Sequence, residues 1–160
     1  MPKKSDRVAI KPRLVLAIDP AKDAGVAVFL DGQLVGYSEA NGTSWTALSP
    51  VIRALVSAYS DIPDNQRHCV IEDGFGRGIG AKTLDRRRGI AQASAESAGF
   101  HSFQLLYPST WQSSTFGPLG GRDTKALSIA YVRDRFQVEG VSHDVADAIS
   151  IGAYVVDANE

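Results

Sequence analysis

The sequence has almost no cysteine and no long hydrophobic run, and both absences narrow the possible functions. Its one cysteine, Cys69, excludes an internal disulfide framework and a cysteine-rich zinc site, and fits a reducing compartment. No stretch approaches the ~18 consecutive apolar residues that a transmembrane helix needs. The basic N-terminus also lacks the apolar segment of a secretory signal. We therefore expect an intracellular protein without a membrane span.

A large excess of charge of either sign is also absent, but the charge is unevenly distributed. The 160-residue chain carries 17 Lys and Arg against 18 Asp and Glu. Residues 1–13 and 77–88 each sum to +4, so a net charge of −1 leaves −9 on the rest of the chain. Basic segments of this kind are typical of a solvated tail and a solvated helix face. They are also typical of a surface that follows a phosphate backbone.

The hydrophobic pattern predicts alternating strands and helices. Strands are expected at 14–19, 25–30, 33–40, 68–73 and 100–107, and helices at 45–60, about 82–98, 123–136 and 143–157, with a helical turn after Pro108. Asp31-Gly32 is a typical hairpin turn between the second and third strands. The order predicts an α/β fold with a mixed five-stranded sheet, a three-strand antiparallel meander plus parallel strands, flanked by helices. We expect one domain over 13–158 and a flexible basic arm over 1–12.

Four carboxylates occur where a core pattern would not place them. Asp19 follows the apolar run LVLAI, and Glu72 follows HCVI. Asp144 and Asp147 share one face of an otherwise apolar helix, and His143, four residues before Asp147, shares it too. Each acid alone has an ordinary explanation, as a turn residue, a strand-end ion pair or a helix cap. Together, without cysteine ligands, they favour Mg²⁺ or Mn²⁺ over zinc.

The order of these motifs resembles that of the RuvC family of Holliday-junction resolvases, in the ribonuclease-H-like superfamily. The matching segments are LAIDPAKDAGVAVF, IEDGF, LYPSTWQSSTFG, GRDTKALSIAYVRDRF and HDVADAISIGAYV, within about residues 13–157. The resemblance implies a ribonuclease-H-like fold. Two positions depart from the family pattern, since Ala21 stands where glycine is usual and Gln112 where lysine is frequent.

The resemblance implies a crossover junction endodeoxyribonuclease, a hydrolase that nicks four-way DNA junctions symmetrically during recombination, repair or DNA processing. It implies Mg²⁺ or Mn²⁺ as cofactor, with two ions in each active site. Asp19, Glu72, Asp144 and Asp147 would be catalytic and would bind the metal, with His143 competing with Asp144 as the fourth ligand. Lys125 would be catalytic, neutralising the scissile phosphate. The alternatives are that Lys125 is an ordinary surface lysine and that His143 is a histidine exposed to water at the start of its helix.

Further residues are implied to contact DNA. Phe75 would stack on a base at the junction, or else pack beneath its own loop. The basic residues expected to follow phosphates are Arg77, Lys82, Arg86, Arg87 and Arg88. Trp45 and Trp111 are instead predicted to be core residues. Two opposed cuts are delivered most simply by a two-fold dimer, so the implied partners are four-way or branched DNA and a second copy of the chain, with residues 82–97 near the interface.

Other functions remain open on the sequence. The same fold and metals would serve a nuclease of flaps and forks, or one that cuts RNA in hybrids. An inactive DNA-binding scaffold is also possible, although the four acids argue against it. The expected location is cytoplasmic or nucleoid-associated, or in an organelle or a virus-infected cell.

Overall fold

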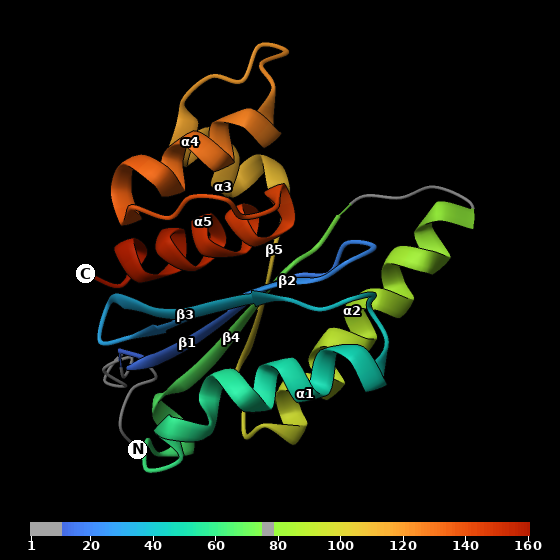
Figure 1. Cartoon of the computed structure of the whole chain (residues 1–160), viewed down its shortest axis with the longest axis vertical. Helices are drawn as coiled ribbons and strands as arrows, with labels where there is room; N and C mark the ends of the chain where they lie inside the picture. The colour runs from blue at the N-terminus through green and yellow to red at the C-terminus, as the bar shows by residue number, and fades with distance from the viewer. Residues whose placement is uncertain (1–10, 75–78) are drawn as a thin grey trace, which may run out of the picture.

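The computed structural model describes residues 11–74 and 79–160, so the predicted arm lies mostly outside the described residues. A five-stranded sheet is covered by helices on both faces (Figure 1). The strands are β1 (Leu14–Asp19), β2 (Gly25–Leu30), β3 (Gln33–Glu39), β4 (Arg67–Glu72) and β5 (Phe103–Leu106). The helices are α1 (Trp45–Val56), α2 (Ile79–Ser97), α3 (Pro108–Phe116), α4 (Thr124–Phe136) and α5 (His143–Ala158). Short 3₁₀ turns span Ser57–Tyr59 and Asp64–Gln66.

The sheet has the predicted mixed topology. Its strand order is β3-β2-β1-β4-β5, with β1 in the centre. The first three strands form the antiparallel meander, and β4 and β5 extend the sheet in parallel from β1. The predicted mixed five-stranded sheet flanked by helices is therefore confirmed. Because β1 and β4 are parallel, their carboxyl ends lie at the same edge of the sheet.

The two faces of the sheet are covered by different helices. α1 and α2 lie on one face, and α3, α4 and α5 on the other (Figure 1). The alternation of side chains along β1 supplies both cores: Leu14, Leu16 and Ile18 join the α1–α2 core, whereas Val15 and Ala17 join the α5 core. Asp19 continues the Val15–Ala17 series and therefore belongs to the α5 face.

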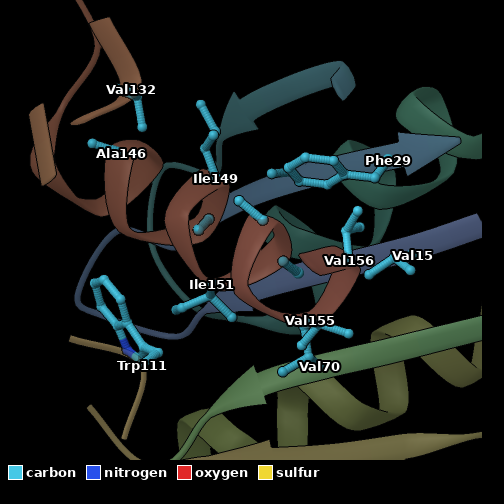
Figure 2. Close-up of a cluster of buried hydrophobic side chains, with 14 of the residues drawn as sticks. Val15, Phe29, Val70, Trp111, Val132, Ala146, Ile149, Ile151, Val155 and Val156 are labelled. Carbon is cyan, nitrogen blue, oxygen red and sulfur yellow. The ribbon is translucent and has the colours of Figure 1, made fainter. Parts of the chain in front are cut away.

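Helix α5 is the centre of the larger core. Figure 2 shows its apolar side chains between the sheet and helices α3 and α4; the labelled residues are Val15, Phe29, Val70, Trp111, Val132, Ala146, Ile149, Ile151, Val155 and Val156. Gly152 allows the close approach of α5, because a Cβ atom there would lie 2.3 Å from Cε2 of Phe29 and 3.2 Å from Cβ of Ala17. This close packing fixes the position of α5 over β1 and β2.

Several boundaries and one side chain differ from the sequence predictions. α1 ends at Val56 and continues only as a 3₁₀ turn, and β5 is shorter than predicted. The prediction that Trp45 is a core residue is wrong, because this side chain is 45% exposed at the first position of α1. Trp111 is fully buried, as predicted. None of the helices in the described ranges combines the length and apolar character needed to cross a membrane.

Candidate active site

Two of the predicted acids lie side by side at the carboxyl edge of the sheet. Asp19 ends β1 and Glu72 ends β4, and the parallel register pairs Ile18 with Ile71 directly before them. Asp19 is only 6% exposed, although no Lys, Arg or His within the described residues forms an ion pair with it. A buried carboxylate without a cationic partner is costly, and such residues concentrate at functional sites.

Helix α5 brings the other two acids to the same edge. Its N-cap is Ser142, whose Oγ accepts a hydrogen bond of 3.2 Å from the backbone N–H of Val145. Gly25 is the register partner of Asp19, and a Cβ atom at this position would lie 2.0 Å from the backbone oxygen of Asp144. The start of α5 therefore lies directly against β2, which places Asp144 and Asp147 near Asp19.

Two buried donors orient individual carboxylate oxygens. The Trp111 Nε1–H group donates a hydrogen bond of 2.7 Å to Oε2 of Glu72. The Ser128 hydroxyl donates one of 2.5 Å to Oδ1 of Asp147. Both donor residues have no exposed surface, and they come from α3 and α4. These helices therefore position the acids as well as covering the core.

Burial and mutual repulsion raise the pKa values of these acids. Burial, and then the charges of Glu72, Asp147 and Asp144, raise the pKa of Asp19 well above its ordinary value. Burial raises the pKa of Glu72 to about 7, although the Trp111 hydrogen bond acts in the opposite direction. Burial raises the pKa of Asp147 to about 6 against the Ser128 hydrogen bond. The four carboxylates are thus close enough to oppose one another's ionisation.

The chemistry of this set suits a hard divalent cation. It offers only carboxylate oxygens, apart from His143, whose Nε2 lies 3.2 Å from Oδ1 of Asp144. No three His, Cys, Asp or Glu side chains in residues 11–74 and 79–160 are already arranged around one ion position. Ligation would therefore have to draw these carboxylates together. A bound cation would offset the repulsion between the ionised carboxylates.

The basic residues predicted to act near the acids have different environments. Lys125 lies in the first turn of α4, exposed, and its charge lowers the pKa values of Asp144 and Asp147, which burial raises. Lys82 and Arg86 are exposed on α2. Arg88 instead forms ion pairs of 2.7 Å with Asp73 and 3.1 Å with Asp85, which tie α2 to the end of β4. The predictions for Phe75 and Arg77 lie outside the described residues.

The raised pKa values predict a pH-dependent stability. The folded protein holds protons on Glu72 and Asp147 that the unfolded chain releases near pH 4, so the free energy of unfolding should fall as the pH rises. The fall should extend from about pH 4 to about pH 7, the raised pKa of Glu72. Glu72 alone would contribute about 3 kcal/mol, which corresponds to several degrees in melting temperature.

Thermal unfolding in EDTA between pH 5 and pH 8 measures this effect. The melting temperature should fall with pH, and added Mg²⁺ should restore more of it at pH 8 than at pH 5, since protonated acids are poor ligands. Glu72→Gln should flatten the curve, whereas Glu139→Gln, at an exposed position, should not. A melting temperature that rises between pH 5 and pH 8 in both the parent protein and the Glu72 variant would contradict the assigned repulsion.

Comparisons with known proteins give structural matches only. No protein-family model and no curated protein sequence matches this chain. A Thermus thermophilus RuvC structure matches with a TM-score of 0.64 and 18% identity, over 91% of this chain and 93% of that chain. T. thermophilus RuvC in complex with a Holliday junction substrate matches with a TM-score of 0.69 and 17% identity, over 92% and 95%. At these identities the likeness is one of architecture, and the chain has the RuvC-like, ribonuclease-H-like fold.

Proposed function

We propose that this protein is a metal-dependent endonuclease that cuts four-way DNA junctions. The observation that carries the proposal is the meeting of Asp19, Glu72, Asp144 and Asp147 at one sheet edge, where each opposes the ionisation of others. The RuvC-like fold supports the substrate class, since one matching structure is a complex with a Holliday junction. The proposed setting is intracellular DNA recombination, repair or processing.

The reaction would be hydrolysis of a phosphodiester bond. A water oxygen forms a new bond to phosphorus, the bond to the leaving oxygen breaks, and the leaving oxygen takes up a proton. Mg²⁺ or Mn²⁺, with two ions in the proposed site, would supply Lewis-acid stabilisation of the charged phosphoryl oxygens and a lowered pKa for the attacking water. The four carboxylates would hold the metal, and their burial would keep bulk water from competing for it.

Residues around the acids have distinct proposed roles. Asp19 ends the central strand β1, the charges of all three other carboxylates oppose its ionisation, and it would be the central metal ligand. Trp111 and Ser128 hold one oxygen each of Glu72 and Asp147, which reduces the rotation that these side chains would lose on binding. Lys125, whose charge acts on Asp144 and Asp147, would offset the charge of the phosphate. His143 remains an alternative to Asp144 as the fourth ligand.

Two cuts at opposed strands of a junction are delivered most simply by two active sites related by a two-fold axis. We propose that a homodimer supplies them, because each chain contributes one set of the four acids. A dimer with one site per subunit would cut a near-symmetric junction at two matching positions. A monomer would instead leave single, independent nicks.

Cleavage of matched substrates tests the proposal. A four-way junction, a flap, a linear duplex and an RNA–DNA hybrid of related sequence are incubated with Mg²⁺, and the cut positions are mapped. We expect paired symmetric nicks in the junction and none in the duplex. Asp147→Asn should remove them, since it takes away one metal-binding charge while preserving the size of the side chain and its place beside Ser128.

Other outcomes of the same experiment would point to other functions. Equal cutting of flaps and junctions would indicate a general branched-DNA nuclease with the same chemistry. Cutting of the hybrid alone would contradict the junction substrate and indicate a ribonuclease H activity. Tight junction binding without cutting in Mg²⁺ or Mn²⁺ would indicate a binding scaffold.

A further inference from the structure

A recess adjoins Asp19 and Glu72 on the side of the sheet covered by α2. A cavity of about 250 Å³ is lined by Asp19 and Glu72, by the turn after β1, and by the first half of α2. α2 and α5 cover opposite faces of the sheet (Figure 1). The cavity therefore reaches two of the acids from the side that Asp144 and Asp147 do not occupy.

Three cations, Lys22, Arg87 and Arg88, line this cavity, and Arg88 is paired there with Asp73. Lys22 is exposed in the turn between β1 and β2, three residues after Asp19. Arg87 lies on the same face of α2 as Leu84 and Arg88, because these positions are three and four residues apart. The Leu84 side chain reaches Gly74 at the end of β4, where a Cβ atom would lie 3.7 Å from its Cδ1. This contact turns the Arg87 face of α2 toward the sheet edge.

Lys22 and Arg87 differ from their neighbour Arg88 in having no anionic partner in the described part of the chain. Arg88 is held by Asp73 and Asp85 at 2.7 and 3.1 Å. No hydrogen bond or ion pair engages the side chain of Lys22 or Arg87 among the described residues. Arg87 is nonetheless only partly exposed. An unpaired, partly buried guanidinium beside a flexible ammonium group is a receptor for an anion with several acceptor oxygens.

We propose that Lys22 and Arg87 together bind one backbone phosphate of the DNA strand, next to the phosphate that the four acids cut. This subsite rests on the proposed nuclease function and adds a positioning contact to it. Arg87 presents a planar fork of N–H donors to two phosphate oxygens, and Lys22 supplies a point charge from the other wall. A strand held there would enter the acid cluster with its register set before hydrolysis. Of the two neighbouring arginines on α2, Arg87 would thus bind phosphate, whereas Arg88 is structural.

The subsite is tested by measuring binding, without cleavage, to DNA in which one phosphate is replaced by an uncharged linkage. The Asp147→Asn protein, in Mg²⁺, is titrated with four-way junctions that carry one methylphosphonate at successive positions around the mapped cut. One neutral linkage should weaken binding about tenfold, the scale of one lost charged phosphate contact. Adding Lys22→Ala and Arg87→Ala should weaken binding of the unmodified junction similarly and reduce its salt dependence by about one ion. The same neutral linkage should then have no further effect.

A matched control removes the same charge elsewhere. Arg53→Ala with Arg133→Ala, at exposed positions on α1 and α4, should leave the effect of the neutral linkage and the salt dependence unchanged. Melting temperatures of both double variants check that each is folded. A Lys22/Arg87 variant that binds like the control, or that still responds to the neutral linkage, would overturn the subsite while junction cleavage by the parent protein would stand. Absence of any junction binding by the parent would overturn the proposed function as well.

Discussion

Asp19→Asn should abolish cleavage and at the same time stabilise the protein. The rate of junction cutting should fall by at least about 10³-fold, because the lost charge is the one adjacent to all the other acids and metal catalysis contributes several kcal/mol. The melting temperature at pH 8 in EDTA should rise. Burial and three neighbouring carboxylates oppose the ionised form of Asp19, and an amide of the same size removes this repulsion. We therefore expect a higher free energy of unfolding for the variant than for the parent protein.

Both effects are measured on the same preparation. Junction cleavage in Mg²⁺ gives the rate, and thermal unfolding at pH 5 and pH 8 gives the stability. The gain should be smaller at pH 5, where more of the acids are already protonated. Asp64→Asn is the control. The Asp64 side chain is 71% exposed, and its one ion-pair contact among the described residues is a long one, 3.8 Å from Oδ2 to Nε2 of His101. Loss of cleavage accompanied by lower stability at both pH values would mean that Asp19 has a structural role instead of the assigned one.

Gly25→Ala should disrupt the site through the backbone. A methyl group at Gly25 would lie 2.0 Å from the backbone oxygen and 2.4 Å from the backbone carbon of Asp144, so the start of α5 must move away from β2. We expect a loss of about 3 kcal/mol of stability, as for severe overpacking of a core. A displacement on the order of 1 Å also costs about 10²-fold in rate when it separates catalytic groups. Cleavage should therefore fall even at temperatures where the variant is folded.

Gly89→Ala is the matched control for this substitution. Gly89 is an exposed position within α2, and a Cβ atom there would meet nothing within 4 Å. The same chemical change should raise stability by about 0.5–1 kcal/mol, because alanine favours the helix. Unfolding curves and cleavage rates of the two variants separate packing from glycine propensity. Equal stability and activity of the Gly25 variant and the parent would contradict the close approach of α5 to β2.

The sheet could be predicted because its strands carry local signals. Short apolar runs such as LVLAID and the Asp31-Gly32 turn indicate strands and a hairpin without any tertiary information. Their boundaries were less predictable. Residues 57–60 continue the helical pattern of 45–56, yet the helix ends at Val56. Trp45, predicted to be a core residue, is instead 45% exposed at the N-terminus of α1.

The acids of the candidate site can also be proposed from the sequence, whereas their surroundings cannot. Asp19, Glu72 and Asp147 follow or interrupt apolar patterns, and this local anomaly is visible in the sequence. The hydrogen bonds from Trp111 and Ser128 have no such signal, since the donors lie 39 and 19 residues from their acceptors. Lys22 carries no signal of this kind although it lies three residues after Asp19, because its place in one cavity with Arg87 depends on how α2 packs.

Local sequence patterns are enough to indicate most strands and helices, the four acids and the clustering of basic residues. These features arise from periodicity, turn chemistry and the placement of charge, all of which act over a few residues. The packing of distant segments determines which basic residues lie near the acids, which arginine pairs with Asp73, and which oxygens of Glu72 and Asp147 accept hydrogen bonds. Those outcomes depend on contacts between segments distant in the chain, above all the approach of α5 to Gly25, and packing over such distances leaves no pattern in a single sequence.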